Sequence, residues 1–130
     1  MKKYLLAICL MATFFGLFNS TAQVQSLKQG SKFMIRHTVV FKLKCPRNSP
    51  EEKDFLNAAK KLANIPGVQN FESLKQVSKK NNFDFGLSIE FANQRLYDEY
   101  LIHPDHTEFI QKYWLKFVED FLEIDYELLK

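Results

Sequence analysis

The chain has 130 residues, 18 of them basic and 15 acidic, and its net charge at pH 7 is +3. Proteins that bind the phosphate backbone of nucleic acids need a clustered excess of positive charge, so this near-neutral balance argues against such a partner. The length suits one domain, and the sequence contains no internal repeat and no glycine-rich phosphate loop.

The first 22 residues are typical of a secretory signal peptide. Two lysines precede an apolar run over residues 4–18, which is shorter than the roughly 20 residues that span a bilayer. Small residues at Ser20-Thr21-Ala22 predict cleavage between Ala22 and Gln23. We therefore expect an exported protein, periplasmic or secreted, without stable membrane insertion. A retained membrane anchor is the alternative.

Cleavage would lower the net charge from +3 to +1, because it removes Lys2 and Lys3 and no acid. It would also remove Cys9, which leaves Cys45 without a cysteine partner in the same chain and excludes an intramolecular disulfide. We interpret Cys45 as an incidental cysteine at a strand end, and a reactive thiol is the alternative.

The domain is expected to begin after a polar, flexible lead-in over residues 23–33. Residues 34–44 alternate between two faces and predict a strand. Its strongly apolar face carries Ile35, His37, Val39, Phe41 and Leu43. A turn follows at residues 45–48.

Ser49-Pro50-Glu51-Glu52 predicts a helix start, because Ser49 can cap the helix, Pro50 fits its first position and Glu52 completes a capping box. Apolar residues at helical spacing continue to Ile65, and Pro66-Gly67 ends the helix. The mostly polar residues 68–77 predict a weaker strand at a sheet edge.

Residues 83–91 alternate most clearly and predict a further strand. A helix is expected over residues 94–102, and it must end near His103 because Pro104 disfavours helical geometry in the residue before it. A second helix starts at Pro104 and runs through Phe117. A last strand is expected around residues 122–128. The acids of this region are interpreted as a solvated or interfacial face rather than a catalytic pair; they are Glu119, Asp120, Glu123, Asp125 and Glu127.

The order of these elements, β-α-β-β-α-β, is that of a ferredoxin-like α+β sandwich. Such a sheet has helices on one face only, and the chain offers no further helix for the other face. The sheet of a second copy of the chain is the simplest way to cover this exposed face. The sequence therefore predicts a homodimer that is formed through the sheets as an α/β barrel.

The residues most suited to chemistry lie at the helix break. Tyr100, His103 and His106 are spaced by three. His106 falls in the first turn of the new helix, where the positive end of the helix dipole disfavours imidazolium and helps to keep a general base neutral. His37 adds an imidazole that could converge with this segment on one cavity. His103 is first interpreted as a residue that fixes the break.

Several motifs together resemble the stress-responsive dimeric α/β-barrel family, called Dabb. In chain order they are the opening strand Ile35–Lys44, the helix exit Ile65–Val68, the third strand Asp84–Phe91, the motif of Tyr100, His103-Pro104 and His106, and the final strand Phe121–Tyr126. The resemblance covers residues 34–128, which we take as the domain.

The resemblance implies a subunit that dimerises through its sheet and holds a pocket between sheet and helices. One enzyme of the family closes a polyketide thioester by aldol condensation, without cofactor or metal. Its catalytic histidine matches His106, and its other pocket residues match Tyr100 and His37. Its pocket tyrosine on the first helix has no counterpart, since Ala58 or Ala59 stands there, and this departure argues against that particular activity.

Two functions stay open from the sequence. The first is an exported, stress-associated protein that binds a small apolar or aromatic ligand with His37, Tyr100, His103 and His106. The second is a cofactor-independent cyclase or lyase-type enzyme, with His106 as the catalytic base and Tyr100 and His37 orienting a carbonyl. A monooxygenase-like function is a third, more distant alternative. The sequence contains no feature that specifically supports haem or flavin binding. We expect no cofactor and no metal, because a proline break interrupts the histidine pair.

Overall fold

The computed structural model describes residues 34–129. The predicted signal peptide and the predicted lead-in fall outside these residues. Within the described part of the chain, no helix is long and apolar enough to cross a membrane.

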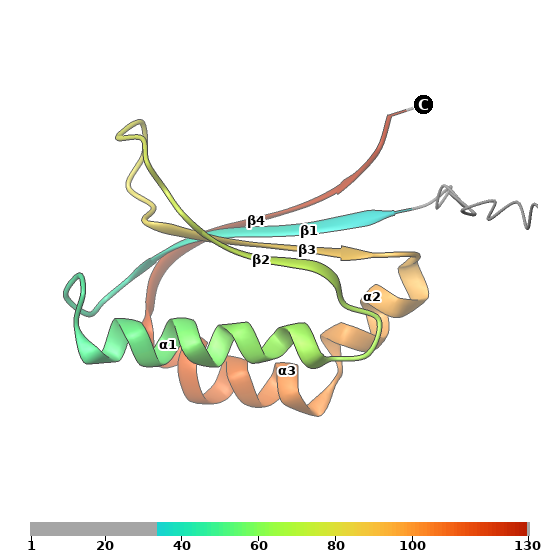
Figure 1. Ribbon diagram of the computed structural model, residues 1–130, viewed down its shortest axis with the longest axis horizontal. Helices are drawn as coiled ribbons and strands as arrows, with labels where there is room; N and C mark the ends of the chain where they lie inside the picture. The colour runs from blue at the N-terminus through green and yellow to red at the C-terminus, as the bar shows by residue number, and fades with distance from the viewer. Residues whose placement is uncertain (1–33, 130) are drawn as a thin grey trace, which may run out of the picture. The chain divides into compact units, whose positions relative to one another are not determined.

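Four antiparallel strands form one sheet, and the helices lie together on one face of it (Figure 1). The strands stand in the order β2-β3-β1-β4, with β1 at Ile35–Leu43, β2 at Gln69–Lys75, β3 at Phe85–Phe91 and β4 at Val118–Glu127. The helical layer consists of α1 (Pro50–Lys60), the 3₁₀ turn η1 (Lys61–Asn64), α2 (Gln94–Leu101), α3 (Pro104–Phe109), the π-helical turn η2 (Ile110–Trp114) and α4 (Leu115–Phe117). The predicted ferredoxin-like α+β fold is thus confirmed.

β1 has the two faces that its alternating sequence predicts. His37, Val39, Phe41 and Leu43 are buried on the inner face, toward the helices. Val40 is exposed on the outer face. Cys45, just beyond the strand, is a free cysteine that is partly buried against the core.

α1 begins where the sequence predicts, but its capping box is only half formed. Ser49 Oγ accepts a hydrogen bond from the Glu52 backbone N–H at 3.1 Å, and Pro50 is the first helical residue. The Glu52 carboxylate does not return the bond, because the Ser49 N–H donates to the Pro46 carbonyl at 3.2 Å. Glu52 Oε2 lies instead 3.2 Å from Arg47 Nε, so this acid ties the helix to the preceding turn.

The predicted end of the first helix near Ile65 is reached through a tighter turn. α1 ends at Lys60, and η1 continues to Asn64. Gly67 follows with a φ of +88°, a left-handed conformation that favours glycine. A side-chain carbon at this position would also meet Leu96 Cδ2 at 3.1 Å, so the glycine permits close packing against α2.

Aromatic rings fill the core between the sheet and the helices. Phe41, Phe55, Phe91 and Tyr100 are among its largest fully buried side chains. The ring centroids of Phe41 and Phe55 are 5.5 Å apart, and those of Phe91 and Tyr100 are 5.0 Å apart. Tilted ring pairs of this kind add to the gain from burial. They hold α1 and α2 against the inner face of the sheet.

The outer face of the sheet carries exposed apolar side chains. Leu122, Ile124 and Tyr126 of β4 are between 40% and 51% exposed, and Val40 of β1 is 37% exposed. Val40 lies opposite Leu122 in the ladder, and Thr38 lies opposite Ile124. Residues directly opposite each other in an antiparallel pair share a face, so these side chains form one surface.

Two acids of β4, Glu123 and Asp125, lie on the other, inner face of that strand. Asp125 lies opposite His37, and Glu123 lies opposite Val39. Both acids are exposed, because β4 is an edge strand. Their exposure agrees with the solvated face that the sequence predicts. That face is nevertheless the one that carries His37, and the sequence interpretation did not place the acids beside it.

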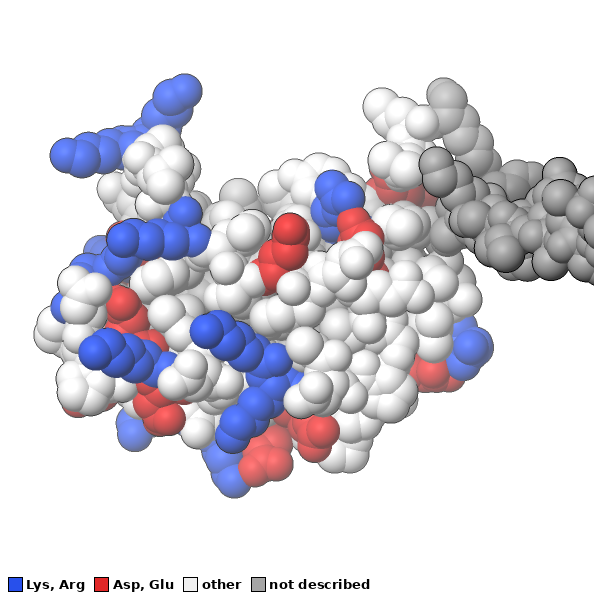
Figure 2. Space-filling model, in the orientation of Figure 1, with Lys and Arg blue, Asp and Glu red and all other residues white. Residues whose placement is uncertain are grey.

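Charged side chains of both signs are interspersed on the molecular face seen in Figure 2. Arg95 pairs with Glu99 at 2.5 Å, and Lys112 pairs with Glu108, in each case one helical turn apart. Exposed pairs of this kind add little to stability.

Candidate functional site

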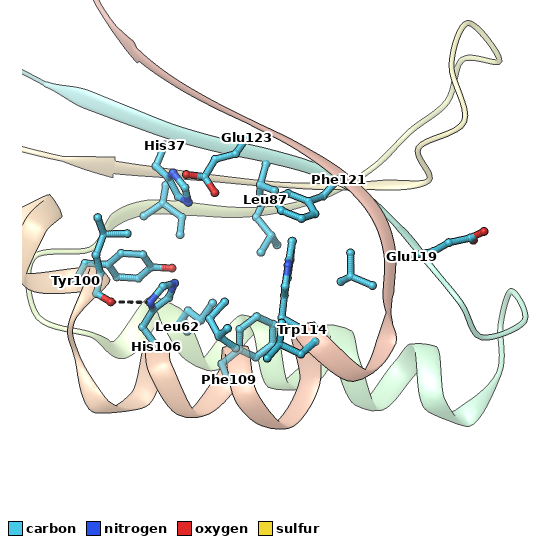
Figure 3. A pocket seen from close by; sticks show the side chains of 16 residues that line it. His37, Leu62, Leu87, Tyr100, His106, Phe109, Trp114, Glu119, Phe121 and Glu123 are labelled. Carbon is cyan, nitrogen blue, oxygen red and sulfur yellow. Dashed lines mark hydrogen bonds between the residues drawn. The ribbon is translucent and has the colours of Figure 1, made fainter.

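A cavity of about 420 Å³ lies between the inner face of the sheet and the helices (Figure 3). Its walls come from β1, β3 and β4 on one side and from η1, α2, α3, η2 and α4 on the other. His37, Tyr100 and His106 line the cavity. Three of the four predicted site residues are therefore brought together. His103, the fourth, is not part of the wall.

His103 shapes the site from outside by fixing the helix break. It is the N-cap of α3, and its Nδ1 accepts a hydrogen bond from the Asp105 backbone N–H at 3.2 Å. Pro104 follows as the first helical residue. The predicted break is thus confirmed, and it brings His106 beside Tyr100, with ring centroids 4.5 Å apart.

The ring of His106 is held with one nitrogen engaged. Its Nδ1 lies 3.1 Å from the Leu101 carbonyl oxygen. A carbonyl can only accept, so Nδ1 carries the proton and Nε2 of the neutral ring keeps a free lone pair. Burial lowers the pKa of His106, and the Leu101 hydrogen bond opposes this only in part. The second nitrogen is directed toward the cavity (Figure 3).

Tyr100 supplies a neutral hydroxyl to the same wall. Its side chain is 2% exposed, and its oxygen points into the cavity (Figure 3). Burial raises the pKa of Tyr100 far above its ordinary value, and the nearby Glu123 charge raises it further. The hydroxyl therefore stays protonated and can both donate and accept a hydrogen bond.

His37 is fixed by a carboxylate on the neighbouring strand. Its Nδ1 lies 2.7 Å from Asp125 Oδ1, and the Tyr97 hydroxyl donates to Asp125 Oδ2 at 2.7 Å. Burial and this hydrogen bond raise the pKa of Tyr97, so its hydroxyl remains a donor. An ionised carboxylate only accepts, so His37 Nδ1 carries the proton of this hydrogen bond.

Glu123 and Asp125 are the site residues that sequence reasoning missed. Glu123 lines the cavity, and Asp125 orients His37. Among the described residues, His37, Glu123 and Asp125 also form a group that could hold a metal ion, with one ligand atom of each within 4.8 Å of the others. The alternation Leu122, Ile124, Tyr126 could have revealed both acids. If these apolar residues form the dimer face, the acids between them must face the helices.

Ala58 and Ala59 are buried in the core, and neither lines the cavity. The helical wall near them is supplied by Leu62 of η1. The enzyme that the family resemblance brings in has a pocket tyrosine on its first helix. In this wall no hydroxyl group takes the place of that tyrosine.

A family model described as the stress responsive A/B barrel domain (Dabb) matches residues 35–128. No curated protein matches the chain significantly. Among solved structures, a Dabb family protein with a ferredoxin-like fold from Mesorhizobium loti is 52% identical, with a TM-score of 0.73. The match covers 76% of this chain and 100% of that protein.

Two more distant structures share the fold. A dimeric ferredoxin-like protein of unknown function from Bacteroides fragilis is 25% identical over 73% of this chain and 96% of its own, with a TM-score of 0.57. A hydroxynitrile lyase from Passiflora edulis is 14% identical over 75% of this chain and 94% of its own, with a TM-score of 0.66. At that identity the lyase shows a common fold alone.

Proposed function

We propose a binding function for this chain, which belongs to the stress responsive A/B barrel domain (Dabb) family. Each subunit of a homodimer binds one small apolar or aromatic molecule in the cavity between sheet and helices. The proposal is carried by one observation, the convergence of His37, Tyr100 and His106 on a cavity whose other walls are mainly apolar.

The cavity has the size and the lining of a small-molecule site. Its volume of about 420 Å³ lies within the range of roughly 300–1,000 Å³ that is usual for ligand pockets. A few polar groups in an apolar cavity fix the orientation of a ligand, while the apolar walls supply most of the binding free energy. The Tyr100 hydroxyl and the unprotonated Nε2 of His106 are such groups.

The homodimer is proposed from the outer face of the sheet. Exposed Leu122, Ile124 and Tyr126 form an apolar surface there, and burial of this surface against a second copy would stabilise both sheets. The Bacteroides fragilis structure of similar fold is described as dimeric. The cavity lies on the other side of the sheet, so a subunit contact through the outer face would not fill it. The leader-like residues 1–22 support export of this dimer.

A second candidate function is a cofactor-independent lyase or cyclase. The observation that favours it is His106, which has a lowered pKa and a free Nε2 beside the Tyr100 hydroxyl. A neutral imidazole in this position can remove a proton from a bound substrate, and the hydroxyl can donate to the substrate oxygen. Turnover that is abolished in His106→Gln, with ligand affinity retained, would distinguish this function from binding alone.

Native mass spectrometry of the protein purified from its own source tests the binding function. We expect a dimer that carries a small organic adduct. The adduct should be lost from Tyr100→Phe and His106→Ala. It should be retained in Tyr113→Phe, because Tyr113 lies on η2 but outside the cavity. Equal adduct occupancy in all four proteins would show that the ligand lies elsewhere.

A further inference from the structure

One carboxylate faces the cavity without a partner. Glu123 of β4 lies opposite Val39, so its side chain is on the inner face of the sheet, and Figure 3 shows it beside His37 above the cavity. In residues 34–129 no lysine or arginine lines the cavity. No hydrogen bond or ion pair to the Glu123 carboxylate forms among these residues.

The other acids near the cavity are already engaged. Glu119 Oε2 lies 3.1 Å from Lys42 Nζ, and its side chain is directed away from the cavity (Figure 3). Asp125 accepts hydrogen bonds from His37 and Tyr97. Asp125 keeps its charge within 4.8 Å of Glu123 but does not line the cavity, so Glu123 is the unpaired carboxylate of the wall itself.

Aromatic rings form part of the same cavity wall. Trp114 and Phe121 meet edge to face, with ring centroids 5.5 Å apart, and the Phe109 ring lies 6.3 Å from Trp114. Aromatic faces attract cations through their quadrupole and do not attract anions. An unpaired carboxylate and aromatic rings in one cavity wall are the groups that recognise an organic ammonium ion.

We infer that the ligand of this cavity is a small organic amine, protonated at neutral pH and carrying an aromatic or apolar group, and that Glu123 selects it. This inference rests on the proposed binding function. The ammonium N–H groups have three acceptors at the cavity wall: the Glu123 carboxylate, the free Nε2 of His106 and the Tyr100 oxygen. A ligand carboxylate, or an enolate formed from a carbonyl compound, would instead face an uncompensated like charge.

The neutrality of His106 supports the same choice. Burial lowers the pKa of this ring, so at neutral pH it offers a lone pair and no repelling charge to a bound cation.

Three probes of similar size and different charge test the inference: 2-phenylethylamine, 2-phenylethanol and 3-phenylpropanoate. Trp114 is the only tryptophan in the sequence and lines the cavity, so its fluorescence reports binding directly. We expect the amine to bind about fivefold more tightly than the alcohol, because it gains one partly exposed ion pair with Glu123. The acid should bind most weakly of the three.

Two variants separate Glu123 from the general charge of the protein. In Glu123→Gln the advantage of the amine over the alcohol should disappear, while the affinity for the alcohol stays within about twofold. Glu119→Gln is the matched control and should retain the advantage, because the Glu119 residue lines the cavity but its carboxylate pairs with Lys42 and points away from it. High salt should shrink the preference in the wild-type protein.

The outcomes distinguish this inference from the function on which it rests. If the alcohol binds and the amine binds no better, or if Glu123→Gln retains the preference, the cavity is a ligand site but Glu123 does not select amines. If none of the three probes changes Trp114 fluorescence or is detected by calorimetry, both the binding function and the inference are wrong.

Discussion

His37 and Asp125 are joined by a hydrogen bond between neighbouring strands, with His37 Nδ1 2.7 Å from Asp125 Oδ1. The two residues lie directly opposite each other in the β1–β4 ladder, so the contact follows from the register of the sheet. The second carboxylate oxygen accepts from Tyr97 of α2 at 2.7 Å. One side chain thus connects β4, β1 and the helical layer at one end of the cavity.

Replacement of Asp125 by asparagine should loosen this connection. We expect Asp125→Asn to lower the free energy of unfolding by about 1–2 kcal/mol, since two hydrogen bonds to a charged acceptor are weakened. The His37 ring should also lose its fixed tautomer, because an amide can either donate to Nδ1 or accept from it. Urea denaturation measures the first effect, and imidazole ¹⁵N chemical shifts measure the second.

Glu127→Gln is the control for this substitution. Glu127 lies two residues further along the same exposed strand, and in the described structure it has no side-chain hydrogen bond. A loss of stability in both variants would indicate a general charge effect on β4. An unchanged His37 tautomer in Asp125→Asn would show that the carboxylate does not orient the ring.

The stability of the protein should fall as the pH is lowered through the range in which His106 titrates. The folded-state pKa of His106 is below its ordinary value of 6.5, so between these two values the unfolded chain binds more protons than the folded one. Stability from this residue is therefore complete above about pH 6.5 and is lost toward the lower, folded-state pKa. Chemical denaturation at pH 7.5 and pH 5 measures the difference.

His106→Gln should lose less stability than the wild-type protein over that pH step. His103→Asn is the matched control, because asparagine can still cap α3 and the residue lies outside the cavity. If His106→Gln and the wild-type protein lose the same amount, burial of the His106 ring does not disfavour its charged form.

The elements of this fold could be predicted because each has a local cause in the sequence. The alternation of β1 places four buried side chains on one face, Ser49 and Pro50 start α1, and Pro104 separates α2 from α3. The convergence of Tyr100 and His106 also follows from this break. All of these features are set by neighbours within a few positions in the chain.

The partners of the site residues could not be predicted in the same way. Whether Asp125 or Ile124 faces His37 depends on how β4 pairs with β1 across about 90 residues of sequence, and a register shift of one residue would exchange them. The same pairing places Phe121 opposite Phe41. The half-formed capping box could not be predicted either. The Glu52 carboxylate pairs with Arg47, and the position of Arg47 depends on the geometry of the preceding turn.

A buried carboxylate on the outer side of the sheet should make stability depend on acid pH. Glu90 accepts hydrogen bonds from Asn70 Nδ2 at 2.5 Å and from Arg36 Nε at 3.0 Å, and these contacts lower its pKa below the ordinary 4.5. We expect Glu90→Gln to be about 1–3 kcal/mol less stable at pH 7, since donors lose a charged acceptor. The gap should close below pH 4.5 as the wild-type carboxylate becomes protonated.

Glu72→Gln serves as the control for Glu90, because Glu72 is exposed on the adjacent edge strand β2. Thermal or urea unfolding of both variants at pH 7 and pH 3.5, at one fixed protein concentration, gives the comparison. A gap for Glu90→Gln that does not shrink between pH 7 and pH 3.5 would mean that the ionised carboxylate does not account for its lower stability.

The outer face of the sheet should be the dimer interface, and a single charge there should disrupt it. Ile124 is 40% exposed between Leu122 and Tyr126 on the apolar face, so Ile124→Lys would bury an unpaired ammonium between two sheets. We expect the dimer to dissociate, with an increase of at least about tenfold in Kd.

Ile102→Lys is the control, because Ile102 is 77% exposed at the end of α2, on the opposite side of the sheet. Size-exclusion chromatography with light scattering at micromolar concentration gives the mass of each protein. A monomeric wild-type protein, or a dimeric Ile124→Lys variant, would place the subunit contact elsewhere. The cavity lies on the inner face, so monomeric Ile124→Lys should still bind its ligand; a loss of binding in the monomer would show that the partner subunit completes the site.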